Sequence, residues 1–304
     1  MTDQRKGFLS GIAAYLLWGL FPLYWPLLKP AGALEILSHR VAWSVLTMTA
    51  VLLATGRLPQ LRAVMADRRS RRLLTLAAVV VATNWGTYIW GVNHHRVVET
   101  SLGYFINPLV TVLMGVLVLG ERLRRGQWVA VGIGVVAVIG LAIEYGRPPW
   151  VALVLAFSFG TYGLAKKQAG VDAVESLTFE TLVLAPLAIS YLIWIGVRGQ
   201  SHVVGYGVGH ALLLALTGLV TAIPLLFFGA AAIRVPMTTL GLLQYLAPVL
   251  QLLLGVTFLN EEMTAMRWAG FVLVWVALGV FTVESLRHQR SLRHRVTQVT
   301  LASP

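Results

Sequence analysis

Long runs of apolar residues, separated by short polar segments, cover most of this 304-residue chain. A helix that crosses a bilayer needs about 20 predominantly apolar residues, and the pattern predicts ten such spans. Their expected bounds are 7–28, 35–55, 73–94, 98–119, 127–144, 149–166, 177–197, 208–231, 237–259 and 266–286. Because the connections are short, we expect an all-α integral membrane protein whose core is the helix bundle itself.

The composition supports the same class. The chain is 57% hydrophobic and 12% charged, with a mean hydropathy of +0.76, which excludes an ordinary soluble globular domain. It has no cysteine, so disulfides and thiol chemistry are excluded. The first apolar run contains Trp18 and Trp25 and has no small-residue cleavage site, so we interpret it as a retained span rather than a signal peptide.

A set of residues recurs at a constant offset of 140 positions. Pro108, Gly115, Leu119, Glu121 and Trp128 return as Pro248, Gly255, Leu259, Glu261 and Trp268. The alternative is an accidental register between Leu- and Val-rich helices, but matched Pro, Glu and Trp favour duplication. A weak internal repeat is typical of two-halved transporters. We predict one five-span repeat over 1–146, a second over 147–287 and a basic tail over 288–304.

An odd number of spans per repeat predicts that the second repeat enters the membrane inverted. The loop charges agree, because the arginine-rich loops at 57–72 and 121–125 correspond to loops at 198–207 and 261–265 that have few or no arginines. Cytoplasmic loops retain Lys and Arg, which places both termini in the cytoplasm and groups Lys166 with the cytoplasmic loop charges. The net charge of +12 therefore indicates orientation in an inner membrane, and we expect no nucleic-acid partner.

Two matched prolines indicate where a site could lie. Pro108 and Pro248 fall near the middle of their spans, and each removes a hydrogen bond to a carbonyl four residues back. Such helix breaks must face protein or a wet cavity, so they favour a transport site near the midplane between the halves. The alternative is that neighbouring hydroxyl groups satisfy two simple kinks.

Polar and aromatic residues gather at the same depth. We predict that they line a substrate cavity, formed by Trp18, Tyr24, Asn84, Trp85, Tyr88, Tyr104, Asn107, Tyr162, Gln244 and Tyr245. Aromatic faces with a few amides and hydroxyls suit a small amphipathic or aromatic organic solute, or a cation held over the rings.

Charges inside the spans are scarce and therefore informative. Arg40 and Glu180 occupy matched repeat positions about five residues into their spans. Snorkelling toward the headgroups explains Arg40 as well as function does, whereas Glu180 could carry a proton if buried. We expect His39 to hydrogen-bond to Glu35. No spacing indicates a metal, a nucleotide or other cofactor, or a catalytic centre.

Five segments resemble a known family. Residues 15–25, 35–40, 101–109, 158–164 and 243–248 are similar to the RarD-type branch of the drug/metabolite transporter superfamily. This resemblance implies ten helices in two inverted EamA-type repeats around a central cavity. It also implies that the first, third, fourth, sixth, eighth and ninth spans line that cavity. Members export amino acids, nucleobase-like metabolites or drugs, and the branch carries a chloramphenicol-related label.

Together these features predict a secondary transporter, an exporter of small organic solutes, that works by alternating access. A membrane-embedded enzyme and a translocator of lipid-linked substrates are the alternatives. The lipid bilayer and a small-molecule substrate are the expected partners, and the sequence specifies no oligomeric state.

Overall fold

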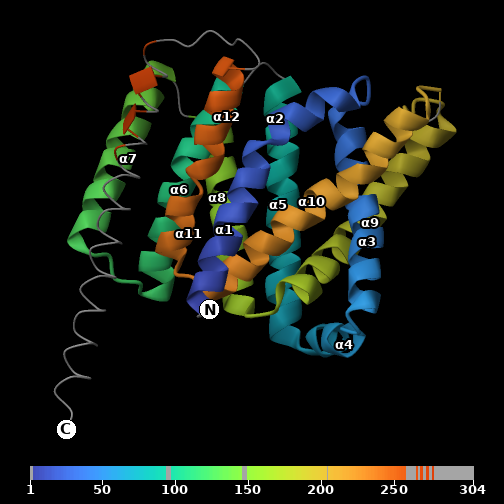
Figure 1. The fold of residues 1–304 in the computed structure, drawn as a ribbon, viewed down its shortest axis with the longest axis horizontal. Helices are drawn as coiled ribbons and strands as arrows, with labels where there is room; N and C mark the ends of the chain where they lie inside the picture. Colours follow the sequence, from blue (N-terminus) through green and yellow to red (C-terminus); the bar gives the residue numbers. More distant parts are fainter. Residues whose placement is uncertain are drawn as a thin grey trace.

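A computed structural model describes residues 3–93, 97–145, 149–203 and 205–257, with the isolated positions 265, 268–269, 272–273 and 276. All regular structure in the described residues is helical (Figure 1). The elements are α1 (Asp3–Gly19), α2 (Phe21–Tyr24), the 3-10 helix η1 (Trp25–Leu28), α3 (Ala33–Ala54), α4 (Leu58–Ala66), α5 (Arg68–Asn93), α6 (Val97–Leu119), α7 (Arg125–Tyr145), α8 (Trp150–Ala169), α9 (Ala173–Val197), α10 (Val208–Arg234), α11 (Met237–Leu243) and α12 (Leu246–Thr257). Most of the expected tenth span and the whole basic tail lie outside the described residues.

The helices follow the expected spans, with two interruptions and one addition. The first span ends its main helix at Gly19 and continues as α2 and η1. The ninth is divided into α11 and α12 by a turn at Gln244 and Tyr245. The short helix α4 forms within the arginine-rich loop, and after it the Asp67 carboxylate accepts the Ser70 amide at 2.7 Å, which caps the start of α5.

The two repeated prolines differ in their effect. Pro248 lies in the first turn of α12, where the missing amide removes no intrahelical bond. Pro108 lies inside α6, which runs uninterrupted, so the predicted break at Pro108 is wrong. Helix α11 packs against α6 at this point: a Cβ on Gly241 would lie 2.7 Å from the Pro108 carbonyl oxygen. Helices α6 and α11 are therefore in close contact at the proline.

When each helix is replaced by its equivalent 140 residues away, a contact between the two halves becomes another contact between them. Helix α3 contacts its repeat equivalent α9, and α6 contacts α11, part of its own equivalent. The contact between α1 and α10 corresponds to the contact between α8 and α5. The contacts between the halves therefore occur in matched pairs under the repeat offset.

Matched glutamates join the ends of α3 and α9. Glu175, in the first turn of α9, lies 3.1 Å from the Arg57 guanidinium just after α3. Glu35, in the first turn of α3, accepts the His202 amide at 2.7 Å and lies 2.6 Å from His202 Nδ1, just after α9. The start of each helix thus meets the end of the other, so α3 and α9 are antiparallel. The predicted bond from His39 to Glu35 is wrong, because the His202 loop occupies this carboxylate.

The repeated Glu121 has a similar bridging role. Its carboxylate follows α6 and accepts the backbone amides of Met237 and Thr238, at 2.7 and 2.9 Å, at the start of α11. These amides have no partner within their own helix. A Cβ on Gly115 would lie 2.9 Å from Glu121 Oε2. The repeated glycine therefore makes room for the repeated glutamate.

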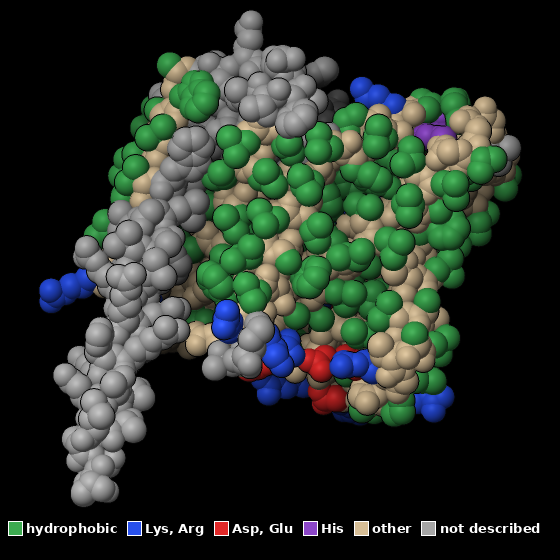
Figure 2. All heavy atoms as spheres, in the orientation of Figure 1, with side chains coloured by type: hydrophobic (Ala, Val, Ile, Leu, Met, Phe, Trp, Pro, Cys, Tyr) green, Lys and Arg blue, Asp and Glu red, His purple; other side chains and the backbone are tan. Residues whose placement is uncertain are grey.

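The surface has an apolar middle and a charged edge. Figure 2 shows hydrophobic side chains over the broad centre of one face, with acidic and basic groups gathered along the edge near α4. By length and apolar character, five helical segments in the described part of the chain could cross a membrane. They are Ala33–Ala54, Arg68–Gly91, Leu102–Leu119, Ala173–Val197 and Val208–Arg234.

Candidate functional site

A cavity of about 280 Å³ lies between the two halves. It is bounded by α1, α2, η1, α3, α5 and α6 from the first half, and by α8, α10, α12 and the Gln244 turn from the second. This volume is close to the lower end of the range for small-molecule sites.

Seven of the ten predicted cavity residues line this space. They are Trp18, Asn84, Trp85, Tyr88, Tyr104, Asn107 and Gln244, and the repeated Pro248 lines it as well. The cavity draws on both repeats, with most of its polar groups from α5 and α6. Their role in binding remains a prediction.

Three predicted residues lie outside the cavity lining. The Tyr24 hydroxyl donates to the Leu213 carbonyl at 2.6 Å, and the Tyr162 hydroxyl donates to Glu180 at 3.0 Å. Tyr245 is buried, with its hydroxyl beside Gly134 of α7. Consecutive residues of a tight turn point in different directions, so Gln244 faces the cavity while Tyr245 faces α7.

The sequence analysis did not assign Arg40 to the cavity. This residue of α3 lines it, and Arg40 Nε donates to Thr221 Oγ1 at 2.9 Å. Its guanidinium carbon lies 4.8 Å from the Trp25 ring centroid and 4.7 Å from that of Trp85. The side chain therefore turns inward rather than snorkelling to the headgroups. The scarcity of charge within the spans was the sequence signal that could have identified Arg40 as a cavity residue. Because Arg40 lies on α3, the second span joins the spans that were expected to line the cavity.

An aromatic cluster supports the wall beside α1. Trp18 makes an edge contact with Phe159, at 5.7 Å between centroids, and packs against Phe228 at 5.6 Å. Tyr15 meets Trp18 edge-on at 5.3 Å. Because these rings come from α1, α8 and α10, they join the two halves through apolar contacts that also shape the cavity.

The side-chain amides that line the cavity differ in their hydrogen bonds. Asn84 Nδ2 donates to the Leu155 carbonyl at 2.8 Å, and Gln244 Nε2 donates to Thr111 Oγ1 at 3.1 Å. Asn107 Oδ1 is buried and has no hydrogen-bond partner among the described residues. Asn84 and Gln244 therefore bind helices together, whereas the Asn107 carbonyl oxygen makes no such link among the described residues.

Glu180 lies in a second, sealed cluster. Its carboxylate lies 2.6 Å from the Lys166 amine and accepts the Tyr162 hydroxyl, and both Glu180 and Lys166 are at most 2% exposed. The Lys166 amine also donates to Ser176 Oγ at 2.9 Å. Lys166 is thus a buried ion-pair partner, which corrects its assignment to the cytoplasmic loop charges.

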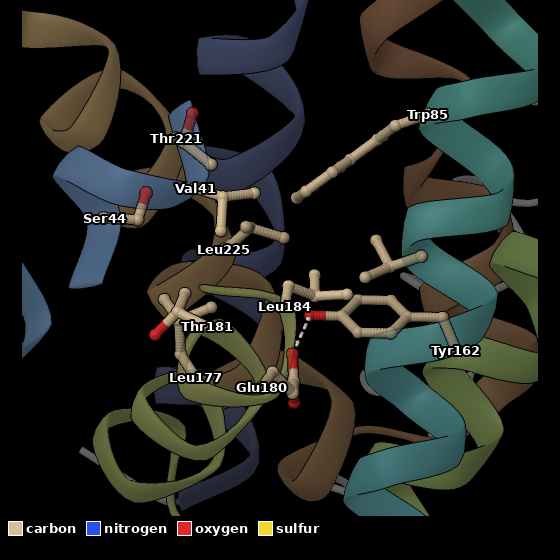
Figure 3. A pocket seen from close by; sticks show the side chains of 11 residues that line it. Val41, Ser44, Trp85, Tyr162, Leu177, Glu180, Thr181, Leu184, Thr221 and Leu225 are labelled. Atoms are coloured by element: carbon tan, nitrogen blue, oxygen red, sulfur yellow. Dashed lines mark hydrogen bonds between the residues drawn. The ribbon is translucent and has the colours of Figure 1, made fainter. Parts of the chain in front are cut away.

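A small void lies between this cluster and the cavity. It measures about 10 Å³, close to the room that one water needs. Tyr162 and Glu180 line it, and so do Trp85 and Leu225, which also line the large cavity. Figure 3 shows the Tyr162 hydroxyl directed at Glu180, with Trp85 at the far side of the void. Within the described part of the chain, no cluster of His, Asp or Glu could hold a metal ion.

A sequence model of the EamA-like transporter family matches the chain twice, over residues 5–143 and 148–283. The chain belongs to the EamA-like transporter family. The two matches correspond to the two halves that surround the cavity.

This EamA-like chain has close relatives of full length. It is 58% identical to Protein RarD of Streptomyces exfoliatus, over 100% of this chain and 97% of the relative. It is 42% identical to the uncharacterized transporter YojE of Bacillus subtilis, over 95% and 98% of the two chains. These similarities place it in the RarD-type branch and indicate a multi-pass membrane transporter rather than an enzyme.

A solved structure shares the fold of this EamA-like chain. It is titled "Crystal structure of protein" and superposes with a TM-score of 0.70 at 21% identity, over 91% of this chain and 97% of the other. At that identity the likeness supports the arrangement of the helices and nothing about cargo.

Proposed function

We propose that this EamA-like transporter is a secondary exporter that carries small organic solutes by alternately exposing the central cavity to the two sides of the membrane. The observation that supports this proposal most directly is the cavity. Residues of both repeats line it, and it lies at the interruption between α11 and α12. A site shared by two repeats changes its access when one repeat rocks against the other.

The proposed topology has ten spans in two inverted repeats, 1–146 and 147–287. The protein crosses the inner membrane, and both termini lie on its cytoplasmic side. The antiparallel pairing of α3 with α9 supports inversion, because these helices are equivalent in the repeat. Glu121 supports it again by joining the end of α6 to the start of α11. The arginine bias of the loops supports the orientation.

The proposed coupling uses Glu180. A proton that reached this carboxylate would neutralise it and loosen its pairing with Lys166. The void between Glu180 and Trp85 has room for the water that such a transfer needs. Protonation could therefore favour one access state over the other without direct contact between Glu180 and the cargo.

Purified protein in sealed vesicles tests both parts of the proposal. The vesicles are loaded with a library of amino acids, nucleobase-like metabolites and antibiotics, and a pH gradient is imposed. Efflux of at least one compound above that from protein-free vesicles is expected. The Glu180→Gln variant, checked by an unchanged elution profile, should lose the dependence on the gradient while keeping downhill flux. Gradient-driven flux that survives Glu180→Gln contradicts the coupling, and an absence of flux for every compound contradicts transport of these solutes.

A further inference from the structure

We propose that the cavity selects a small organic monoanion, a carboxylate attached to an apolar or aromatic body, and that Arg40 binds the carboxylate. This inference rests on the proposed function and identifies the class of cargo.

Arg40 has unused donors that point into the cavity. Its Nε is bound to Thr221, but among the described residues neither terminal guanidinium nitrogen has a hydrogen-bond partner. Two tryptophan rings, Trp25 and Trp85, lie within 4.8 Å of the guanidinium carbon. These contacts fix the position of the cation and partly offset its desolvation, while leaving the donor edge available.

The described part of the cavity provides no counter-ion. None of the described lining residues is Asp or Glu, and Arg40 takes part in no ion pair with another described residue. The carboxylate at the matched repeat position, Glu180, is already paired with Lys166. Arg40 is partly buried, and a cation withdrawn from water without a counter-ion is costly, so a bound anion would supply an interaction that the described residues do not.

The geometry favours a carboxylate over other anions. A guanidinium presents parallel N–H donors that match the two oxygens of a carboxylate. A phosphate dianion needs more positive charge than one arginine supplies, and no Lys is among the described residues that line the cavity. The Trp18, Trp85 and Phe159 rings give the rest of the cargo an apolar surface.

Calorimetric titration of detergent-purified protein with three compounds of one ring system tests this selection. The compounds are 2-naphthylacetate, its neutral amide 2-naphthylacetamide and the cation 2-naphthylethylammonium. We expect the acid to bind about 10-fold or more tightly than the amide, because hydrogen bonds to charged groups are the stronger ones, and the cation to bind most weakly. Equal binding of acid and amide, or no measurable binding of the acid, overturns the inference.

Variants of Arg40 test whether this residue causes the preference for the acid. Arg40→Gln should weaken binding of the acid about 10- to 100-fold and leave the amide nearly unchanged, whereas Arg40→Lys, which keeps the charge but not the planar donors, should retain part of the affinity. The matched control is Arg198→Gln, an exposed arginine stacked on Trp194, which should change nothing. Unchanged binding of the acid in Arg40→Gln overturns the role of Arg40.

Flux measurements on the same three compounds separate this inference from the proposed function. Protein-dependent movement of the amide but not the acid would leave transport standing and overturn the anion selection. Tight, Arg40-dependent binding of the acid without any protein-dependent flux would support the anion site and contradict transport of this compound.

Discussion

Arg40 and Glu180 occupy the same position in the two repeats, on helices that pack against each other, yet their surroundings are opposite. Arg40 faces the cavity, in contact with two tryptophan rings and without an acidic partner among the described residues. Glu180 is sealed from the cavity and satisfied by Lys166 and Tyr162. The repeat therefore places a charge at the same position of both helices, while the neighbouring side chains decide whether it faces the cavity or is held within the protein.

The difference predicts unequal responses to mutation. Removing one member of a buried ion pair leaves the other charge without compensation, which is strongly destabilising. Removing the charge of Arg40, which has no counter-ion among the described residues, leaves no other charge there without compensation. The Lys166–Glu180 pair should therefore dominate stability, and Arg40 should dominate binding.

The largest expected effect is that of Lys166→Met. It leaves the Glu180 carboxylate buried without its cation, which should cost about 3–5 kcal/mol and lower the thermal midpoint of the detergent-purified protein markedly. The double variant Lys166→Met/Glu180→Leu should recover much of that loss, because an apolar pair replaces the ionic one. A single variant as stable as the parent would show that the pair does not have this role.

A smaller effect is expected for Tyr162→Phe. The change keeps the ring stacked on Phe228, at 5.4 Å between centroids, and removes only the hydroxyl that donates to Glu180. It should cost about 1.5–3 kcal/mol, the usual range for a hydrogen bond to a charged group. Thermal melting with Tyr24→Phe as the matched control distinguishes the loss of this bond from the loss of any tyrosine hydroxyl, since Tyr24 donates to a neutral carbonyl. A larger loss in the control would contradict the assignment.

The smallest effect concerns the support of Arg40. Thr221→Val removes the acceptor of Arg40 Nε and keeps the shape of the side chain. The guanidinium remains between Trp25 and Trp85, so affinity for 2-naphthylacetate should fall only about threefold to tenfold, the equivalent of one modest hydrogen bond. Calorimetric titration measures the change. A loss as large as that of Arg40→Gln would mean that Thr221, rather than the two rings, holds the arginine in place.

The helical layout was largely predictable from the chain. Apolar runs of bilayer length gave spans that match α3, α5, α6, α8, α9 and α10 within a few residues at most ends. The repeat identified Glu121 and Gly115 as special positions, although only the structure shows that one caps α11 and the other makes room for it. A hydrophobic pattern is a local property of the sequence, so it can be recognised without knowing which other segments a helix packs against.

The missed features depend on contacts between distant segments. A proline predicts a lost hydrogen bond in any helix, but whether the helix breaks depends on its neighbours: Pro108 lies against α11, and Pro248 begins α12. Lys166 looked like a loop charge because its partner lies on another helix, 14 residues away. The direction of Arg40 was undetermined for the same reason, since two tryptophans from other segments turn it inward.

Access to the cavity from both sides of the membrane is the central claim, and the absence of cysteine makes it directly measurable. Asn107→Cys places a single thiol in the cavity lining, and Thr217→Cys, fully buried in α10, serves as the sealed control. The measurement is the rate of reaction with a membrane-impermeant maleimide in right-side-out and in inside-out vesicles. Alternating access predicts labelling of Asn107→Cys in both preparations and of Thr217→Cys in neither; labelling of Asn107→Cys from one side only, or from neither side, would contradict it.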